Sequence, residues 1–117
     1  VHPFLDDQSP RHSSHMSGFF GLDPTGVYAG GSSLVALGTL PPGRALEWGR
    51  AAMTANPDSD TLYFGCPHWT VIDAIQPLEE EFGISVMTSL QAIAWESMRK
   101  TGIDDRIKGF GRLLSEF

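Results

Sequence analysis

Residues 61–88 have the sequence TLYFGCPHWTVIDAIQPLEEEFGISVMT, and this stretch decides the fold. It begins with Thr61–Phe64, a short run of β-branched and aromatic residues that is largely apolar on both faces, as in a buried parallel strand. The next segment is predicted to be a helix that ends at Phe82, with Gly83 as its C-terminal cap. Ile84–Thr88 are then predicted to form a second short strand. Strand, helix and strand with short links indicate a parallel pair with a right-handed crossover, and therefore an α/β fold.

One further helix is expected before this unit, and another is expected after it. Pro41 and Pro42 predict the first turn of a helix that ends at Asn56, because a missing N–H costs little in the first turn. That helix has an apolar stripe at helical spacing, made of Ala45, Leu46, Gly49, Ala52 and Met53. Ser89 is the expected N-cap of the second helix, which runs to Thr101. Its predicted apolar face consists of Leu90, Ile93, Ala94 and Met98. Pro77, inside the central helix, is expected to kink or restart it.

The N-terminal part of the chain carries weaker patterns. Residues 18–38 are rich in glycine and leave room only for short strands, for which Gly21–Tyr28 and Leu34–Leu37 are the candidates. With these two, a parallel sheet of about four short strands flanked by helices is predicted. Residues 1–17 are polar and irregular, and they are expected to form either a short helix or a mobile segment. Residues 1–117 together are expected to form a single α/β domain.

The composition of the chain limits the classes of function that it can have. The 117 residues are 41% hydrophobic and 19% charged, which is typical of one compact globular domain. With 14 acidic and 8 basic side chains the net charge is −6, and no basic stripe exists, which argues against nucleic acid and anionic membranes as partners. No apolar stretch approaches the roughly 18 residues of a membrane span, and no signal-peptide pattern opens the chain. A single cysteine excludes an internal disulfide and favours a reducing, cytoplasmic location. Val1, in place of methionine, suggests a fragment or a processed piece.

Cys66 is the strongest candidate for chemistry. It follows the first predicted strand and precedes a helix, at the sheet edge where α/β proteins bind ligands. The positive end of the helix dipole lowers the pKa of a thiol there, so that the thiol can exchange a proton or attack as thiolate. The alternative is a buried cysteine that packs as a small apolar residue. His68, two residues further on, allows a Cys/His nucleophile and thus a third possibility, a cysteine hydrolase.

Other patterns are weaker. His12 and His15 have the spacing of metal ligands on a helix but lack a convincing third ligand, so no metal site is predicted. Gly30–Ser33 lacks the lysine of a phosphate-binding loop. Glu79–Glu81 is interpreted as a solvated helix face. The three tryptophans, Trp48, Trp69 and Trp95, are interpreted as core or interface residues. Of these, only Trp69 is adjacent to the proposed site.

Five segments occur in the order and spacing of a known family: His2–Asp7, Pro57–Asp60, Ile72–Ile75, Ser85–Ser89 and Gly109–Leu114. On these segments, and on Cys66 between the second and third, the chain resembles the C-terminal half of the Asp/Glu racemase superfamily. The similarity is greatest to its arylmalonate decarboxylase and maleate cis-trans isomerase branches. It extends over nearly the whole chain and is weakest from Gln8 to Met16.

The resemblance implies one half of a pseudo-twofold, two-domain enzyme that works without a cofactor at the carbon α to a carboxylate. It implies that Cys66 donates or removes a proton there, and that the substrate is a small carboxylic or dicarboxylic acid. Lining residues are expected at Phe4, Leu34, Leu37, Pro67 and His68. Such enzymes need both halves, so the chain alone is expected to be inactive, and a missing N-terminal half or a homo-oligomer is the expected protein partner.

Two departures from the family pattern support a different class of function. Decarboxylases of the family have glycine after the cysteine, and its backbone N–H helps to hold the substrate oxyanion, whereas Pro67 has no N–H. Phe4 stands where the family often has tyrosine, which removes a hydroxyl donor. His68 is a candidate replacement donor. The alternative is therefore a non-catalytic binding or interaction module that retains the fold.

Overall fold

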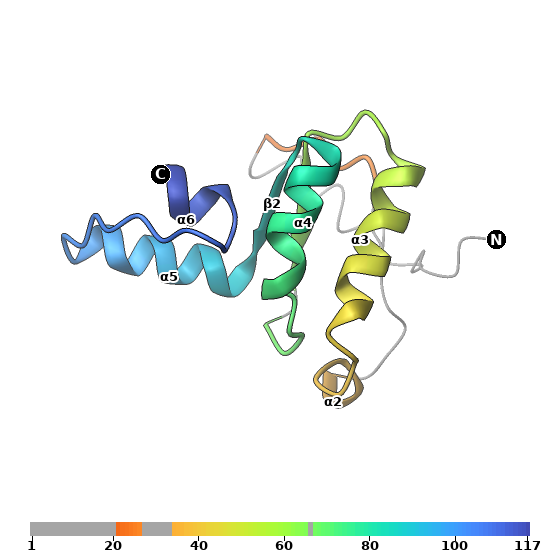
Figure 1. Cartoon of the computed structure of the whole chain (residues 1–117), viewed down its shortest axis with the longest axis horizontal. Helices are drawn as coiled ribbons and strands as arrows, with labels where there is room; N and C mark the ends of the chain where they lie inside the picture. The colour runs from red at the N-terminus through yellow and green to blue at the C-terminus, as the bar shows by residue number, and fades with distance from the viewer. Residues whose placement is uncertain (1–20, 27–33, 66) are drawn as a thin grey trace.

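The computed structural model describes residues 21–26, 34–65 and 67–117 of the chain (Figure 1). Within them the helices and strands follow one another in this order: α2 (Leu34–Leu37), α3 (Gly43–Ala55), β1 (Thr61–Phe64), α4 (Ile72–Phe82), β2 (Ser85–Thr88), α5 (Ser89–Lys100) and α6 (Arg112–Glu116). None of the described helices has the length and hydropathy needed to cross a membrane.

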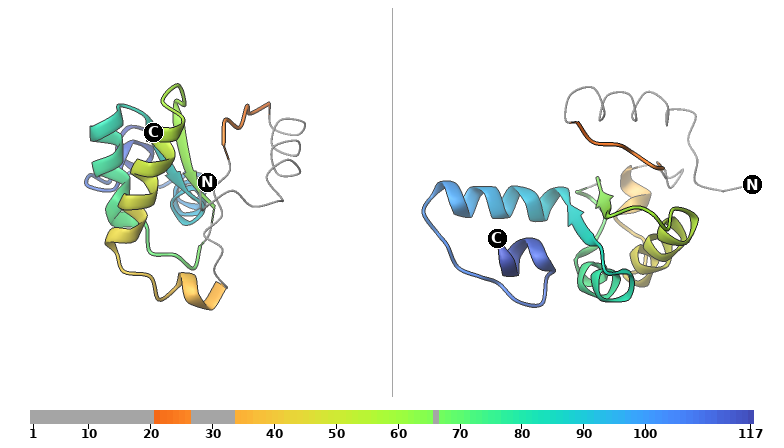
Figure 2. Two further views of the ribbon diagram at one scale, coloured as in Figure 1. Left: turned by 90° about the vertical axis from the view of Figure 1, so that its right-hand side faces the viewer. Right: turned by 90° about the horizontal axis from the view of Figure 1, so that it is seen from above.

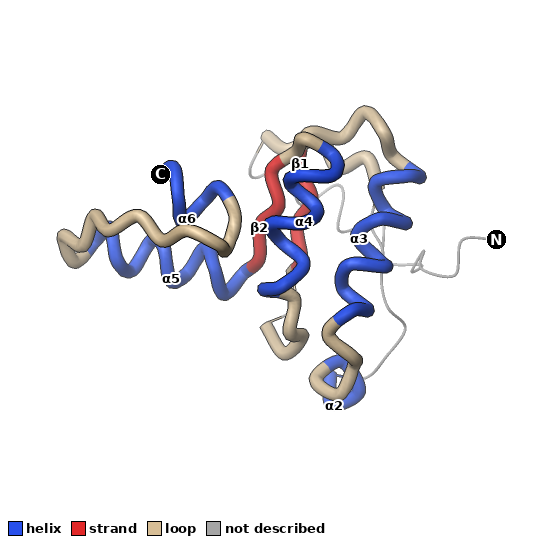
Figure 3. Tube along the Cα trace, viewed as in Figure 1, coloured by secondary structure: helices blue, strands red, loops and turns tan. Residues whose placement is uncertain are grey.

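The two strands form a parallel pair, in which Thr61 is opposite Ser85 and Phe64 is opposite Thr88. Helix α4 connects them, and α3 and α4 lie side by side against the pair (Figures 2 and 3). The arrangement confirms the predicted α/β fold with a parallel sheet. The described residues contain two strands instead of about four.

Both N-terminal strand predictions fail where the structure describes them. Leu34–Leu37 form one turn of α-helix, and Gly21–Gly26 have no regular secondary structure. Four apolar residues fit a helical turn as well as a strand, so periodicity alone could not separate the two. Val27 and Tyr28, the rest of the first candidate strand, and residues 1–17 lie outside the described residues.

The core lies between the strand pair and the two helices that pack on it. Its largest fully buried side chains are Ile75 and Leu78 from α4 and Val86 from β2. The predicted stripe of α3 is confirmed, because Ala45, Gly49, Ala52 and Met53 are buried and Leu46 is partly buried against the core. The prediction that strand β1 is buried on both faces is wrong. Phe64 is in the core, whereas Tyr63, on the opposite face, is half exposed.

Helix α4 contains Pro77 and is nevertheless uninterrupted from Ile72 to Phe82. The sequence allowed Pro77 to restart the helix, but the structure shows that it does not. Its missing N–H leaves one helical hydrogen bond unmade, while Ala74, Ile75 and Leu78 keep the inner face of α4 in the core. The predicted cap is confirmed: Gly83 has a left-handed φ of 67°, and its N–H donates to the carbonyl of Glu79 at 2.9 Å.

Helix α5 differs from its prediction in its cap and in its buried face. Thr88, not Ser89, is the N-cap, and its Oγ1 accepts the backbone N–H of Gln91 at 3.0 Å. The predicted apolar face is not covered by the described residues, since Leu90 is 56% exposed and Ile93 is 61% exposed. The buried residue of α5 is instead Gln91.

Candidate functional site

The carboxyl ends of β1 and β2 meet because the strands are parallel and Phe64 pairs with Thr88. The loop after β1 leads to the N-terminus of α4, and α5 begins directly after β2. The hydroxyl of Ser89, the first residue of α5, donates to the carbonyl of Gly65 across the two strand ends at 3.5 Å. Helix α2 and the N-terminus of α3 lie at the same end of the molecule (Figure 1). This end is called the carboxyl edge below.

Three of the predicted site residues belong to this end of the fold. Pro67 and His68 are exposed in the turn that follows β1. Leu37 is partly buried in α2. Cys66, Phe4 and the side chain of Leu34 lie outside the described residues. The structure therefore places Leu37, Pro67 and His68 at the carboxyl edge.

Trp69 anchors the loop after β1 to the core. Its ring meets Phe64 edge to face, with centroids 5.5 Å apart and planes at 85°. It also meets Trp48 of α3, with centroids 5.0 Å apart. The core role that the sequence suggested for Trp69 is thus confirmed. Its indole Nε1–H is buried and has no hydrogen-bond partner among the residues that the structure describes, which is an uncommon state for a buried donor.

The N-terminus of α4 supplies the local electrostatics. Val71 caps the helix without a side-chain hydrogen bond, so the first backbone N–H groups of α4 are not satisfied by a capping side chain. These groups and the helix dipole favour negative charge. The chain's own Asp73, in the first turn, supplies one such charge. An anionic ligand at this end would lie in the same positive field as Asp73.

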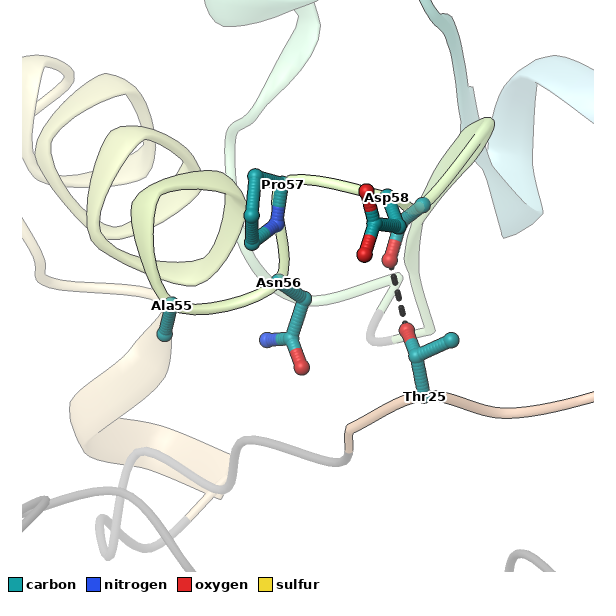
Figure 4. A pocket seen from close by; sticks show the side chains of 6 residues that line it. Thr25, Ala55, Asn56, Pro57 and Asp58 are labelled. Atoms are coloured by element: carbon teal, nitrogen blue, oxygen red, sulfur yellow. Dashed lines mark hydrogen bonds between the residues drawn. The ribbon is translucent and has the colours of Figure 1, made fainter.

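The shallow pocket drawn in Figure 4 lies elsewhere, between the end of α3 and the start of β1. It has a volume of about 200 Å³ and is lined by Thr25, Ala55, Asn56, Pro57, Asp58 and Ser59. The hydroxyls of Thr25 and Ser59 are hydrogen bonded at 2.6 Å. Since it lies at the amino end of β1, this pocket is separate from the carboxyl edge. No group of three potential metal ligands occurs among the residues that the structure describes.

Glu79 is the residue that the sequence interpretation most clearly missed. Glu80 and Glu81 are exposed, as expected of a solvated face, but Glu79 is buried. Its Oε1 accepts the backbone N–H of Val86 at 3.1 Å, and its Oε2 accepts that of Arg112 at 2.8 Å. Helical spacing gave a usable signal, because Glu79 follows the buried Ile75 by four residues and lies on the same face of α4.

Gln91 supports the same region from α5. Its Nε2 donates to the carbonyl of Phe110 at 2.6 Å, while its Oε1 is buried and has no partner in the described part of the chain. The sequence Thr88-Ser89-Leu90-Gln91 has the form of a capping box, which would have identified Thr88 as the cap. Glu79 and Gln91 together hold the segment before α6 against the sheet, which positions the elements behind the carboxyl edge.

The family model described as arylmalonate decarboxylase matches residues 32–114, which is well over half of the chain. The chain belongs to the arylmalonate decarboxylase family. This confirms the resemblance to the Asp/Glu racemase superfamily that the ordered segments indicated. The matched range includes β1, α4, β2 and α5, and with them the loop that carries Cys66.

Individual relatives agree with this assignment. Arylmalonate decarboxylase of Bordetella bronchiseptica is 28% identical over 115 residues, which cover 97% of this chain and 48% of that protein. A crystal structure of arylmalonate decarboxylase is 27% identical, with a TM-score of 0.80 over 95% of this chain and 49% of the other. A mutant of that enzyme in the liganded form gives a TM-score of 0.85, over 97% and 49%. The chain thus spans about half the length of the relatives it matches.

Proposed function

We propose that this chain supplies the cysteine-bearing half of a cofactor-independent enzyme that acts at the carbon α to a carboxylate. The proposed substrate is a small carboxylic or dicarboxylic acid. The observation that supports the proposal most is the family match over residues 32–114, which includes a cysteine directly after β1. That position is the edge at which open parallel sheets bind their ligands. A cytoplasmic location is part of the proposal, and the single cysteine supports it.

In the proposed decarboxylation, the bond from the α-carbon to one carboxyl group breaks and carbon dioxide leaves. The electron pair of that bond remains on the substrate as an enediolate. Cys66 then transfers its thiol proton to the α-carbon, and water reprotonates the resulting thiolate. In a racemase version, the same sulfur removes or adds the proton at this carbon. In an isomerase version, it contributes a thiol beside the reacting double bond. A positioned general acid of this kind typically contributes about 10²–10⁴-fold in rate.

The enediolate also needs hydrogen-bond donors. Pro67 cannot provide a backbone N–H, and a single oxyanion donor is worth roughly 3 to 4 kcal/mol of barrier. His68 is exposed in the same turn, and we propose that its ring N–H takes this place. The N-terminus of α4, which has no capping side chain, supports anion binding at the same end. Leu37, Leu34 and Phe4 are the proposed apolar lining.

The test uses the natural full-length protein with a panel of substituted malonates, maleate and amino dicarboxylic acids. Carbon dioxide release reports decarboxylation, exchange of the α-proton in D₂O reports racemisation, and conversion of maleate to fumarate reports isomerisation; NMR follows the last two. Cys66→Ala should lower turnover by about 10²–10⁴-fold on every substrate that is active. A Cys66→Ala protein with unchanged turnover would contradict the role of the thiol.

His68→Ala is the companion variant. It should weaken turnover less than Cys66→Ala does, because it removes a donor and not the proton source. A covalent acyl adduct on Cys66, seen by mass spectrometry, would instead indicate a hydrolase with a Cys/His nucleophile. Ligand binding without any turnover would indicate a binding module.

A further inference from the structure

Two aromatic side chains lie at the two ends of the segment that follows β1. Phe64 is the last residue of β1, Trp69 comes five positions later, and their rings meet edge to face with centroids 5.5 Å apart. Between them the sequence holds Cys66 and the exposed residues Pro67 and His68. The contact between the two rings therefore closes the base of the segment that carries the proposed thiol and the proposed donor.

Trp48 joins this contact from α3. Its ring meets the ring of Trp69 edge to face, with centroids 5.0 Å apart and planes at 66°. Phe64 is buried in the core, and Trp69 is partly buried against it. Trp69 thus packs on a strand through one neighbour and on a helix through the other. The rings of Trp48, Phe64 and Trp69 are called the aromatic clamp below.

The backbone of the segment has weaker support. Among the described residues, Gly65 and residues 67–70 make no hydrogen bond to another backbone group. The hydroxyl of Ser89 donates to the carbonyl of Gly65, but at 3.5 Å, which is long for a hydrogen bond. Ring packing in the aromatic clamp is therefore the main support that the described part of the chain gives to this segment.

The ring of Trp69, and not its N–H, provides this support. The Nε1 atom is buried and has no hydrogen-bond partner within the described ranges. An unpaired buried donor costs free energy, whereas an edge-to-face pair of rings is favourable beyond the area that it buries. Phenylalanine can make such ring contacts without bringing the unpaired donor. A phenylalanine variant therefore separates the contribution of the ring from that of the N–H.

We propose that Trp69 is a positioning residue for the proton transfer proposed for Cys66. It fixes the segment after β1 against β1 and α3, so that the thiol keeps its place relative to the substrate carbon. Proton transfer needs this precision, since a displacement of about 1 Å can lower a rate by about 10²-fold. Trp69 itself touches no reacting atom. The inference rests on the proposed function and adds to it the residue that holds the thiol-bearing segment in place.

Steady-state kinetics of the natural full-length protein test the proposal. Trp69→Ala should lower kcat by about 10–10²-fold and change KM by less than about threefold, because placement of the thiol acts in the transition state. Trp69→Phe keeps a ring in the clamp and should restore kcat to within about threefold of the natural value. Urea denaturation reports the folded fraction of each variant, so that a loss of folded protein is not counted as a loss of kcat.

Trp95→Phe is the matched control. Trp95 lies in α5, and its Nε1–H donates to the carbonyl of Phe117 at 3.0 Å. This variant should lower stability, because it removes a hydrogen bond, and it should leave kcat unchanged. Trp48→Ala opens the aromatic clamp from the α3 side and should lower kcat in the same direction, so that the test does not depend on the folding of Trp69→Ala.

A double variant tests whether Trp69 acts through the thiol. In the Cys66→Ala background, Trp69→Ala should lower turnover by less than about threefold further, since the group that it positions is already absent. Hydrogen exchange of residues 65–70 is a readout that needs no turnover. Exchange there should be faster in Trp69→Ala than in the natural protein, and unchanged in Trp95→Phe.

Three outcomes would overturn the proposal. Folded Trp69→Ala and Trp48→Ala proteins with the natural kcat would show that the aromatic clamp does not affect the reaction. A Trp69→Phe protein of natural stability that loses as much kcat as Trp69→Ala would show that the indole N–H acts directly. Full multiplication of the two losses in the double variant would show that Trp69 does not act through Cys66. Unchanged turnover in Cys66→Ala alone would instead reject the proposed function, and hydrogen exchange would still report whether the clamp fixes the segment.

Discussion

The carboxylate of Glu79 accepts the backbone N–H of Arg112 at 2.8 Å, across a sequence separation of 33 residues. Its second oxygen accepts the N–H of Val86 at 3.1 Å. One buried side chain of α4 thereby joins the start of α6 to the middle of β2. Both donors are backbone N–H groups, and the hydrogen bonds that they make here go to one carboxylate.

Replacing Glu79 should therefore destabilise the fold far more than replacing its neighbour. A hydrogen bond to a charged group contributes about 1.5–3 kcal/mol, and Glu79→Ala removes two and leaves two N–H groups unpaired. We expect a loss of about 3 kcal/mol or more in the free energy of unfolding, measured by urea denaturation. Glu80→Ala is the matched control. Glu80 is exposed and accepts an exposed hydrogen bond from Gln76 of the same helix, so its replacement should change stability by no more than about 0.5 kcal/mol. Equal effects of the two variants would contradict the buried role.

Gly111 precedes Arg112 in a conformation that only glycine adopts readily, with φ of 88° and ψ of 174°. A Cβ there would clash with Cγ2 of Ile75 and lie 3.2 Å from Oε2 of Glu79. Strain and clash together predict that Gly111→Ala destabilises the protein by about 3 kcal/mol or more. Gly109 also has a positive φ, of 94°, but its Cβ would meet open space. Gly109→Ala should cost only about 1–2 kcal/mol. Thermal unfolding of the two variants checks the difference, and the same Tm for both would refute it.

Local sequence patterns predicted most of the central unit. The β-branched and aromatic run at Thr61–Phe64, the glycine cap at Gly83 and the stripe of α3 each depend on neighbouring residues, and each is confirmed. The features that were missed include short segments and contacts between distant residues. Leu34–Leu37 has no periodicity long enough to separate a helical turn from a strand.

The candidate site and the packing of α5 show the same limit. Sequence order alone brings the loop after β1 to the carboxyl edge, so the place of Pro67 and His68 could be predicted. Helical spacing places Glu79 on the buried face of α4, but its hydrogen-bond partners could not be predicted, because one of them, Arg112, comes from a distant part of the chain. Leu90 and Ile93 have the spacing of a buried face, but periodicity does not say which element covers that face.

The ion pair between α3 and α4 should contribute little. The Nε of Arg50 lies 2.7 Å from Oε2 of Glu81, but the two side chains are 51% and 39% exposed. Exposed pairs typically contribute up to about 1 kcal/mol, and salt screens them. A double-mutant cycle with Arg50→Ala and Glu81→Ala should give a coupling below about 1 kcal/mol. That coupling should fall further in 1 M NaCl. A larger coupling that resists salt would contradict this expectation.

Gly49 sets the distance between α3 and α4, and two opposing effects decide what Gly49→Ala does. Alanine gains about 1 kcal/mol of helix propensity over glycine in a helix interior. Its Cβ, however, would clash with Cδ1 of Leu78 and lie 3.0 Å from Cδ2, and Leu78 is fully buried. Overpacking a core typically costs about 1–3 kcal/mol, which exceeds the gain. We therefore expect Gly49→Ala to lower stability, as measured by urea denaturation.

Two further variants test this balance between propensity and packing. Gly43, the first residue of the same helix, has nothing near its Cβ position, so Gly43→Ala should be neutral or slightly stabilising. Leu78→Val removes a methylene at the point of the clash. In the Leu78→Val background, Gly49→Ala should therefore lose less stability than in the natural protein, because the helices no longer compete for that space. An unchanged cost in both backgrounds would mean that the contact between Gly49 and Leu78 does not limit the approach of α3 to α4.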